Sequence, residues 1–122
     1  MPAFPILRRK ADFDAVGRRG VSRSSRLLVL RALRTEGSTT RIGLSTPRTL
    51  GGAVQRNRVR RRLRALIGER YGEMQTGWDL LVIARPEAAH ATYAELRDAL
   101  AAVMGRTVMR EAPPSARPEA AP

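Results

Sequence analysis

The sequence predicts one small domain of mixed α and β structure, in which helices pack against a β-sheet. A chain of 122 residues is long enough for one hydrophobic core and too short for two domains. Apolar runs typical of strands also alternate with segments of helical periodicity. A strand, a helix and a second strand follow one another between residues 40 and 85, an order that favours two parallel strands joined by a crossover.

The first helix is expected just after the basic start of the chain. Asp12 and Asp14 suit its opening turn, because acidic side chains stabilise the positive end of a helix. Gly17 or Gly20 should close it. Phe13 has two possible roles, as part of the core or as a ring that stacks on a nucleobase; the sequence does not separate them.

Two strands are expected next. Residues 25–33 (SRLLVLRAL) are apolar almost throughout, which suits a strand covered on one face and partly on the other. Residues 35–39 have turn chemistry, and residues 40–46 (TRIGLST) alternate well enough to form the hairpin partner of the first strand. Gly43 would let another backbone or a ligand approach closely.

A strongly basic helix is expected from residues 51–64 (GGAVQRNRVRRRLR), which hold six arginines between Arg56 and Arg64. At about 100° per residue, an apolar stripe can dock on a core while the opposite face is almost wholly cationic. No acidic residue offsets this face before Glu69. Guanidinium groups bind phosphate in a two-pronged geometry, so the pattern favours an RNA-docking helix over a merely solvated basic face. The stripe consists of Val59, Leu63, Leu66 and Ile67.

The last strand and helix follow. Residues 78–85 (WDLLVIAR) form a near-continuous apolar run between Gly77 and Pro86, which is typical of a buried central strand. Thr92 and Glu95 match a capping box, and a helix with an apolar stripe should run to about Gly105. The stripe is Leu96, Leu100, Val103 and Met104. Residues 1–110 are therefore expected to form the domain, and residues 111–122, rich in Pro and Ala, a disordered tail.

Charge and composition narrow the function. The net charge is +12, and residues 1–64 hold seventeen basic residues against three acidic ones, while residues 65–122 hold six against eight. Such an asymmetry indicates a polyanion-binding face on an ordinary scaffold. The chain has no Cys and a single His, His90, which is expected on the surface, so neither a protein-only metal site nor a catalytic residue set is predicted. No membrane span or signal peptide is apparent, which predicts a cytoplasmic protein without a membrane partner.

Four segments together resemble the protein subunit of bacterial ribonuclease P. They match in order and spacing from about Leu7 to about Met104, and the GxAVxRN frame with its Arg-Asn-Arg core is the most specific of them. The segments are Leu7-Arg8-Arg9 with Asp12-Phe13, then Arg41-Ile42-Gly43-Leu44-Ser45, then residues 52–64, and finally residues 79–85.

The resemblance implies an α+β two-layer sandwich. Its four-stranded sheet packs with about three helices in the order α-β-β-β-α-β-α, and one βαβ crossover is left-handed, against the general rule. It also implies that the protein is not the chemical catalyst. In this family the RNA subunit, with its Mg²⁺ ions, cleaves precursor tRNA to release the 5′ leader. The protein binds the RNA subunit and holds the single-stranded leader between the first helix and the sheet.

The resemblance also assigns residues. Arg56, Asn57, Arg58, Arg60, Arg61 and Arg64 are expected to contact the RNA subunit and nearby precursor tRNA; Phe13, Arg31, Ser45 and Arg48 to line the leader cleft; and Arg8, Arg9 and Lys10 to support them. Three positions depart from the family pattern. Gly17 stands where a second aromatic is frequent, Arg31 where a strand tyrosine is frequent, and Thr49 where a lysine is frequent. Arg31 could offset the lost aromatics by a phosphate or stacking contact.

Other functions compete with this interpretation. A ribosomal protein or RNA chaperone of similar fold would carry the same basic helix without processing precursor tRNA. A DNA-binding protein could use residues 54–67 as a recognition helix, but residues 41–47 predict a strand where a helix-turn-helix would need a helix. A membrane-surface helix would leave the strands unexplained. The expected partners are therefore the RNA subunit and precursor tRNA, with no obligate protein partner.

Overall fold

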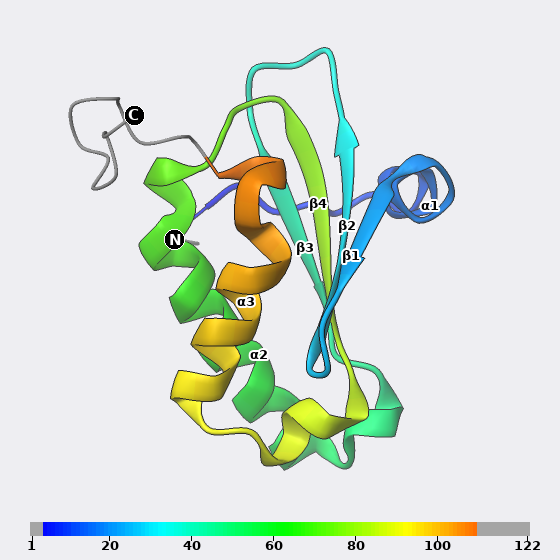
Figure 1. Cartoon of the computed structure of the whole chain (residues 1–122). Coiled ribbons are helices and arrows are strands. Elements are labelled where there is room, and N and C mark those ends of the chain that lie inside the picture. The colour runs from blue at the N-terminus through cyan, green and yellow to red at the C-terminus, as the bar shows by residue number, and fades with distance from the viewer. Residues whose placement is uncertain (1–3, 110–122) are drawn as a thin grey trace, which may run out of the picture.

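Figure 1 shows the computed structural model, which describes residues 4–109. The described chain forms helices and strands in the order α-β-β-β-α-β-α that the family resemblance implies, and the sequence pattern predicts all of these elements except β1. The predicted tail, residues 111–122, lies outside the described residues. The elements are α1 (Lys10–Arg19), β1 (Val21–Ser24), β2 (Leu28–Arg34), β3 (Arg41–Ser45), η1 (Arg48–Leu50), α2 (Ala53–Arg70), η2 (Tyr71–Glu73), β4 (Trp78–Ala84), η3 (Pro86–His90) and α3 (Tyr93–Val108).

The four strands form one mixed sheet in the order β1-β2-β4-β3. β4 pairs antiparallel with β2 and parallel with β3, which confirms the predicted crossover through α2. The predicted hairpin between residues 25–33 and 40–46 is wrong, because β4 lies between these two strands. β4 is buried on both faces and suits the centre, whereas β3 carries Arg41 and Ser45 and suits an edge.

The first predicted strand begins later than expected and is preceded by another. The Oγ atom of Ser25 accepts hydrogen bonds from the backbone N–H groups of Leu27 (3.3 Å) and Leu28 (3.1 Å), and this turn chemistry delays β2 until Leu28. On the other side of the turn, β1 pairs antiparallel with β2. All four β1 residues are exposed, so they carry no alternating pattern that could mark a strand from the residues alone.

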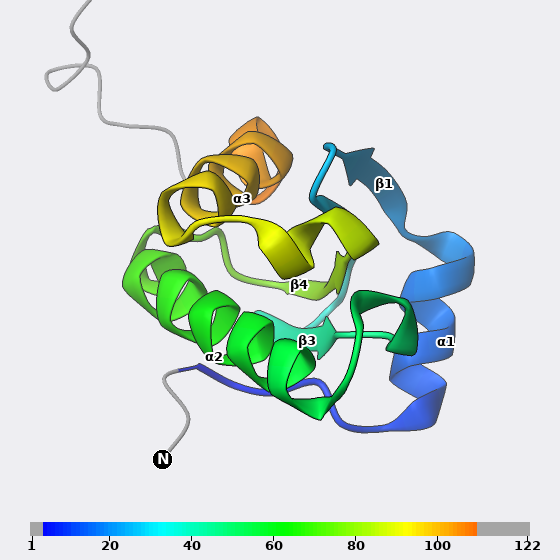
Figure 2. The ribbon, with the colours of Figure 1, turned by 90° about the horizontal axis from the view of Figure 1, so that it is seen from below.

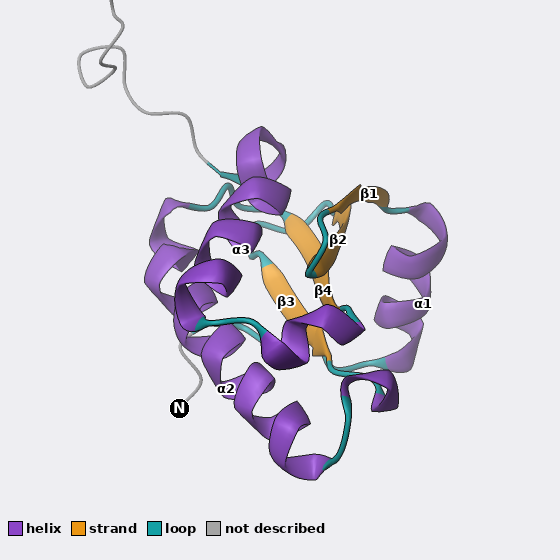
Figure 3. Ribbon diagram, turned by 60° about the horizontal axis from the view of Figure 1, so that its bottom comes forward, coloured by secondary structure: helices purple, strands orange, loops and turns teal. Residues whose placement is uncertain are grey.

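The main core lies between the sheet and the α2–α3 layer, while α1 covers part of the opposite face (Figure 2). Every residue of both predicted apolar stripes is buried there. Figure 3 shows α2 and α3 side by side on their common face of the sheet. The Thr92–Glu95 capping box is confirmed, but α3 continues beyond the predicted end through a non-helical Gly105 (φ 33°) to Val108. His90 is exposed, as expected.

A smaller apolar cluster of Leu7, Val16 and Leu81 holds α1 against the sheet. Phe13 packs on this cluster, and its ring lies over Gly43: a Cβ atom added at Gly43 would stand only 2.7 Å from the Cε1 atom of Phe13. The close approach predicted at Gly43 is therefore made by the protein's own phenyl ring. Phe13 is half-buried, so its ring both packs against the sheet and reaches the surface.

Candidate nucleic-acid interface

The six arginines of α2 between Arg56 and Arg64 separate into three groups by their contacts. The first group points away from the protein: Arg61 and Arg64 are exposed, and within residues 4–109 neither donates a hydrogen bond or forms an ion pair. Asn57 is exposed on the same helix. A guanidinium group without a protein partner keeps all five of its N–H donors for a ligand. These two arginines are the parts of the predicted RNA-contacting set that are most available to phosphate.

The second group binds the segment before α3. The Nη2 atom of Arg58 donates to the carbonyl of Ala89 at 3.1 Å, and the Nη1 atom of Arg62 donates to the carbonyl of Ala91 at 3.1 Å. Both residues are half-buried. Arg58 belongs to the set predicted to contact RNA, but one of its N–H donors is used within the protein.

The third group surrounds Thr46, at the end of β3. The Nε atom of Arg56 donates to the Thr46 carbonyl at 2.8 Å, and the Nη2 atom of Arg60 donates to the Thr46 Oγ1 at 2.6 Å. Arg60 also reaches the Oδ1 of Asn57 at 3.2 Å. Thr46 is 4% exposed and had no assigned role in the sequence, although a threonine directly before Pro47 is a recognisable strand end. It ties the first turns of α2 to β3.

Three of the four residues predicted to line the leader cleft share one face of the sheet. Side chains alternate along a strand, so Ser45 lies on the same face as Gly43, over which the Phe13 ring lies. Arg31 lies on this face too, because its guanidinium reaches α1. Arg48 is exposed in η1, three residues beyond Ser45. The α1 side of the sheet therefore brings together an aromatic ring, a hydroxyl group and cationic side chains.

Arg31 is bound to the C-terminal end of α1. It donates to the carbonyl groups of Val16 (3.3 Å), Gly17 (2.6 Å) and Gly20 (3.3 Å). A cation at this end satisfies carbonyl groups that the helix leaves without partners and complements the helix dipole. In place of the tyrosine frequent in the family, this chain thus has a side chain that anchors α1 to β2. Gly17 also departs from the family pattern, which frequently has an aromatic residue there. A Cβ atom at Gly17 would meet nothing within 4 Å, so this position leaves open space beside the Arg31 anchor.

The other end of α1 is held by an ion-pair network that the sequence analysis missed. The Nε and Nη2 atoms of Arg41 bind the two carboxylate oxygens of Asp79 at 3.0 and 2.7 Å, and its Nη1 binds Asp12 at 3.2 Å. The hydrogen bond to Asp79 raises the pKa of Arg41, the nearby charges of Asp79 and Asp12 add to the rise, and desolvation opposes it. The sequence feature that could have predicted this network is Asp79, an acid inside an otherwise apolar strand. A buried carboxylate needs a charged or hydrogen-bonding partner.

The basic residues before α1 lie on the surface. Arg8, Arg9 and Lys10 are all exposed. Arg9 lies 3.6 Å from Asp12 and Lys10 lies 3.3 Å from Asp14, both at helical spacing. Exposed pairs of this kind contribute little to stability, so the three cations remain accessible at the entrance to the α1 side of the sheet.

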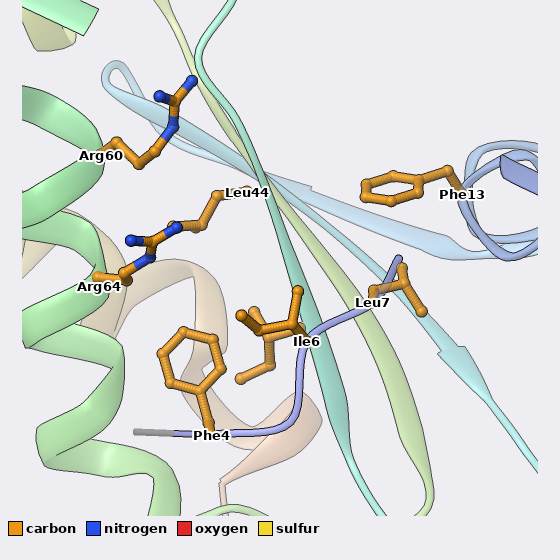
Figure 4. Close-up of a pocket in the computed structure, with 8 residues that line it drawn as sticks. Phe4, Ile6, Leu7, Phe13, Leu44, Arg60 and Arg64 are labelled. Carbon is orange, nitrogen blue, oxygen red and sulfur yellow. The ribbon is translucent and has the colours of Figure 1, made fainter. Parts of the chain in front are cut away.

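A pocket of about 120 Å³ lies where the N-terminal segment, β3 and α2 meet (Figure 4). Arg60 and Arg64 extend from α2 toward Leu44, and the Phe13 ring approaches the same strand from the other side. The pocket is lined by Phe4, Ile6, Leu7, Phe13, Ile42, Leu44, Arg60 and Arg64. Its lining includes Arg60 and Arg64 of the predicted RNA-contacting set and Phe13 of the predicted leader cleft.

Within residues 4–109, no helix is both long enough and apolar enough to cross a membrane. No group of three or more His, Cys, Asp or Glu side chains in that part of the chain is placed to hold a metal ion.

Comparison with known proteins agrees with this geometry. A family profile described as Ribonuclease P matches residues 1–108. The ribonuclease P protein component of Bacillus cereus strain AH820 is 36% identical over 112 residues, which cover 91% of this chain and 94% of that protein. The ribonuclease P protein of Staphylococcus aureus superposes with a TM-score of 0.75 at 28% identity, covering 80% of this chain and 90% of that one. The Thermotoga maritima protein (TM-score 0.71, 24% identity, 78% and 90% covered) shows the same fold.

Proposed function

This chain belongs to the ribonuclease P protein family, and we propose that it binds both the RNA subunit of that enzyme and the single-stranded 5′ leader of precursor tRNA. As a protein component it is part of an endoribonuclease holoenzyme whose partner is an RNA subunit. Binding to the leader promotes its removal, which leaves the mature 5′ end of the tRNA. The cytoplasm, where tRNA is matured in bacteria, is the proposed location.

The observation that carries the proposal is the presence of two different kinds of surface on the two sides of β3. Arg61 and Arg64 of α2 lie exposed on one side and form no hydrogen bond or ion pair within residues 4–109, and the half-buried ring of Phe13 lies on the other side. Phosphate groups bind the first kind of surface, and unstacked bases bind the second. A folded RNA and a single strand can therefore meet on adjacent surfaces of one small domain.

We assign the chemistry to the RNA partner. The role of this chain is to place cations where the RNA subunit and the precursor would otherwise repel each other, which raises precursor affinity and lowers the Mg²⁺ concentration that the enzyme needs. The Mg²⁺ ions are proposed to be held mainly by the RNA subunit and the substrate. No side chain of this protein is proposed as an acid, a base or a nucleophile.

The test is reconstitution. Purified protein is mixed with a bacterial ribonuclease P RNA and precursor tRNA at a Mg²⁺ concentration where the RNA alone is nearly inactive. The expected result is a large gain in cleavage at the mature 5′ end. If cleavage does not rise, or rises equally at other positions, the protein has another role, and a ribosomal or chaperone function becomes the better explanation.

A finer test concerns Phe13. Phe13→Leu keeps an apolar side chain over Gly43 and removes the aromatic surface, so the fold should persist while base stacking is lost. We expect the affinity for leader-bearing precursor to fall about five- to tenfold, at the lower end of what stacking contributes, with little change for mature tRNA. Equal losses for both RNAs would assign Phe13 to packing alone.

A further inference from the structure

The outer edge of β3 is covered over only part of its length. The N-terminal segment runs beside it and forms two backbone hydrogen bonds with Ile42: Leu7 N–H donates to the Ile42 carbonyl, and Ile42 N–H donates to the Pro5 carbonyl, both at 3.0 Å. Beyond Leu7 the segment leaves the sheet and enters α1. The strand therefore continues past the point where its covering segment ends.

Leu44 lies in the uncovered part. Backbone groups of a strand alternate in direction, so the N–H and C=O of Leu44 point to the same outer side as those of Ile42. Two residues later, the outward carbonyl of Thr46 accepts a hydrogen bond from Arg56. Within residues 4–109, neither the N-terminal segment nor a side chain binds Leu44 on that side. One adjacent donor and acceptor pair is thus left open between two occupied positions.

The surroundings of this pair are apolar on one side and cationic on the other. The pocket described above includes Leu44 itself, with Phe13 near one end and the guanidinium groups of Arg60 and Arg64 near the other (Figure 4). Arg64 is exposed and forms no hydrogen bond or ion pair with the described residues. The pocket therefore combines an apolar wall, the open backbone groups of Leu44 and the cationic side chain of Arg64.

We propose that this gap in the β3 edge is a binding site for one unstacked nucleotide, with its base on the Leu44 backbone and its phosphate on Arg64. Every nucleobase carries an adjacent donor and acceptor on an edge that becomes accessible once the base is unstacked. Recognition by the backbone would then select an unstacked base rather than a particular sequence. The site rests on the proposed function and adds to it a contact between the α2 arginines and the leader side of the sheet.

A protein strand fits this edge poorly. Adding a peptide strand requires a run of open backbone groups, and here only one residue is open between Ile42 and Thr46. The neighbouring cations also favour an anionic ligand. The RNA subunit and the precursor offer the same chemistry, so either RNA can supply the nucleotide.

The direct test follows the Leu44 amide in the ¹⁵N-labelled full-length protein. It is titrated with each of the four nucleoside 5′-monophosphates and, as a control, with ribose 5-phosphate. The expected result is a shift of the Leu44 amide resonance with nucleotides only, and a shift of the Arg64 side-chain resonances with both. If the Leu44 amide resonance does not shift with any nucleotide, or shifts equally with ribose 5-phosphate, the proposal is overturned.

A second test removes the donor. Proline is tolerated on an edge strand where its missing N–H faces outward, so Leu44→Pro deletes the proposed contact, and Leu44→Ala is the matched control that shortens the side chain but keeps the N–H. Binding of the RNA subunit to the protein, and of precursor to the reconstituted holoenzyme, is measured for both variants. We expect Leu44→Pro to weaken one of these two affinities, that of the RNA which supplies the nucleotide, about fivefold relative to Leu44→Ala, the effect of one lost hydrogen bond. Equal affinities of the two variants for both RNAs would contradict the site, and the amide titration decides the matter if the proline variant does not fold.

The source of the nucleotide is found by crosslinking. A photoreactive uridine analogue is placed either in the leader or in single-stranded parts of the RNA subunit, and peptides crosslinked to residues 42–46 are identified. Crosslinks from one RNA assign the site to it, and crosslinks from neither contradict the site. Failure here with normal stimulation of cleavage would refute only the nucleotide site, whereas loss of stimulation by the unmodified protein would refute the proposed function.

Discussion

The two sides of α2 use the same residue type for different purposes. On the side toward α3, Arg58 and Arg62 donate to the backbone carbonyls of Ala89 and Ala91 and are half-buried. On the outer side, Arg61 and Arg64 are exposed and bind nothing within the described residues. The sequence pattern does not show which of these four arginines bind the protein itself. The inward roles of Arg58 and Arg62 are set by carbonyl acceptors that lie about thirty positions away along the chain.

The comparison shows that the number of arginines in the sequence of α2 overestimates how many of them are available to bind RNA. Part of the arginine content holds the domain together, because a guanidinium group can satisfy several carbonyl or carboxylate oxygens at once. Arg31, which caps α1, and Arg41, which binds Asp79 and Asp12, belong to the same inward class. Inward arginines should therefore affect stability, and outward arginines should affect RNA binding.

The largest effect is expected at Arg41. Arg41→Met would leave the carboxylate of Asp79, whose residue is 4% exposed, without its main partner. We expect the free energy of unfolding to fall by about 3 kcal/mol, the lower end for a broken buried pair because Arg41 is itself one-third exposed. Urea denaturation measures this. Arg41→Met with Asp79→Asn should recover part of the loss, and an unchanged unfolding midpoint in the single variant would remove Arg41 from the inward class.

The next largest effect is expected on RNA binding, at the outward arginines Arg61 and Arg64. Arg61→Gln with Arg64→Gln should reduce RNA-subunit affinity about a hundredfold and lower the log–log salt slope by about 0.7–0.9 for each lost phosphate contact. Stability should stay within about 0.5 kcal/mol. Filter binding over a range of salt concentrations tests this, with Arg97→Gln on α3 as the control. An unchanged slope would mean that neither side chain touches phosphate.

A smaller loss of stability is expected on the inner side of α2. Arg62→Met removes the hydrogen bond to the Ala91 carbonyl and should lower the free energy of unfolding by about 1–2 kcal/mol, with little effect on the salt slope. Arg58→Met should behave similarly if its contact with Ala89 is its main role. A slope change for Arg58→Met without a stability change would instead place Arg58 with the outward arginines, as the family resemblance predicts.

The smallest effect concerns pH. The pKa of Arg41 is raised further above its ordinary value, chiefly by its hydrogen bond to Asp79. A raised pKa means that the stabilising contribution is complete below the unfolded-state pKa and is lost only as the pH rises through the folded-state value. The difference in unfolding free energy between wild type and Arg41→Met should therefore be constant from about pH 6 to pH 9. Denaturation at several pH values checks this, and a slope would indicate that another titrating group acts through Arg41.

Local pattern was enough to predict the helices and the central strand. The stripes of α2 and α3 follow the helical period, and the capping box at Thr92 marks a helix start within one residue. The order of the strands was not predictable in this way. The run at β4 indicates burial on both faces, but it does not say which two strands cover its edges, and the hairpin expected between β2 and β3 was the wrong choice.

The site was predictable in composition but not in geometry. Charge and family resemblance named Arg56 to Arg64 and Phe13, while the fold decided that Arg58 faces Ala89 and that Phe13 lies over Gly43. Leu44 carried no signal at all, because its proposed role uses backbone atoms that every residue possesses. The uncovered position on β3 results from where the N-terminal segment turns into α1, and this depends on packing around Leu7 and Val16.

The position of β4 also sets an order of events during synthesis. β4 is the last strand to be synthesised, and it lies between β2 and β3. The central strand of the sheet is therefore incomplete until residue 84 has left the ribosome. By then residues 1–64, with their excess of fourteen positive charges, have emerged without a partner sheet. We expect arrested nascent chains to gain protease resistance only once β4 is outside the exit tunnel, in a single late step. Until then, we expect the residues of the future RNA-binding surface to carry this excess of positive charge close to ribosomal RNA without the finished sheet to pack on.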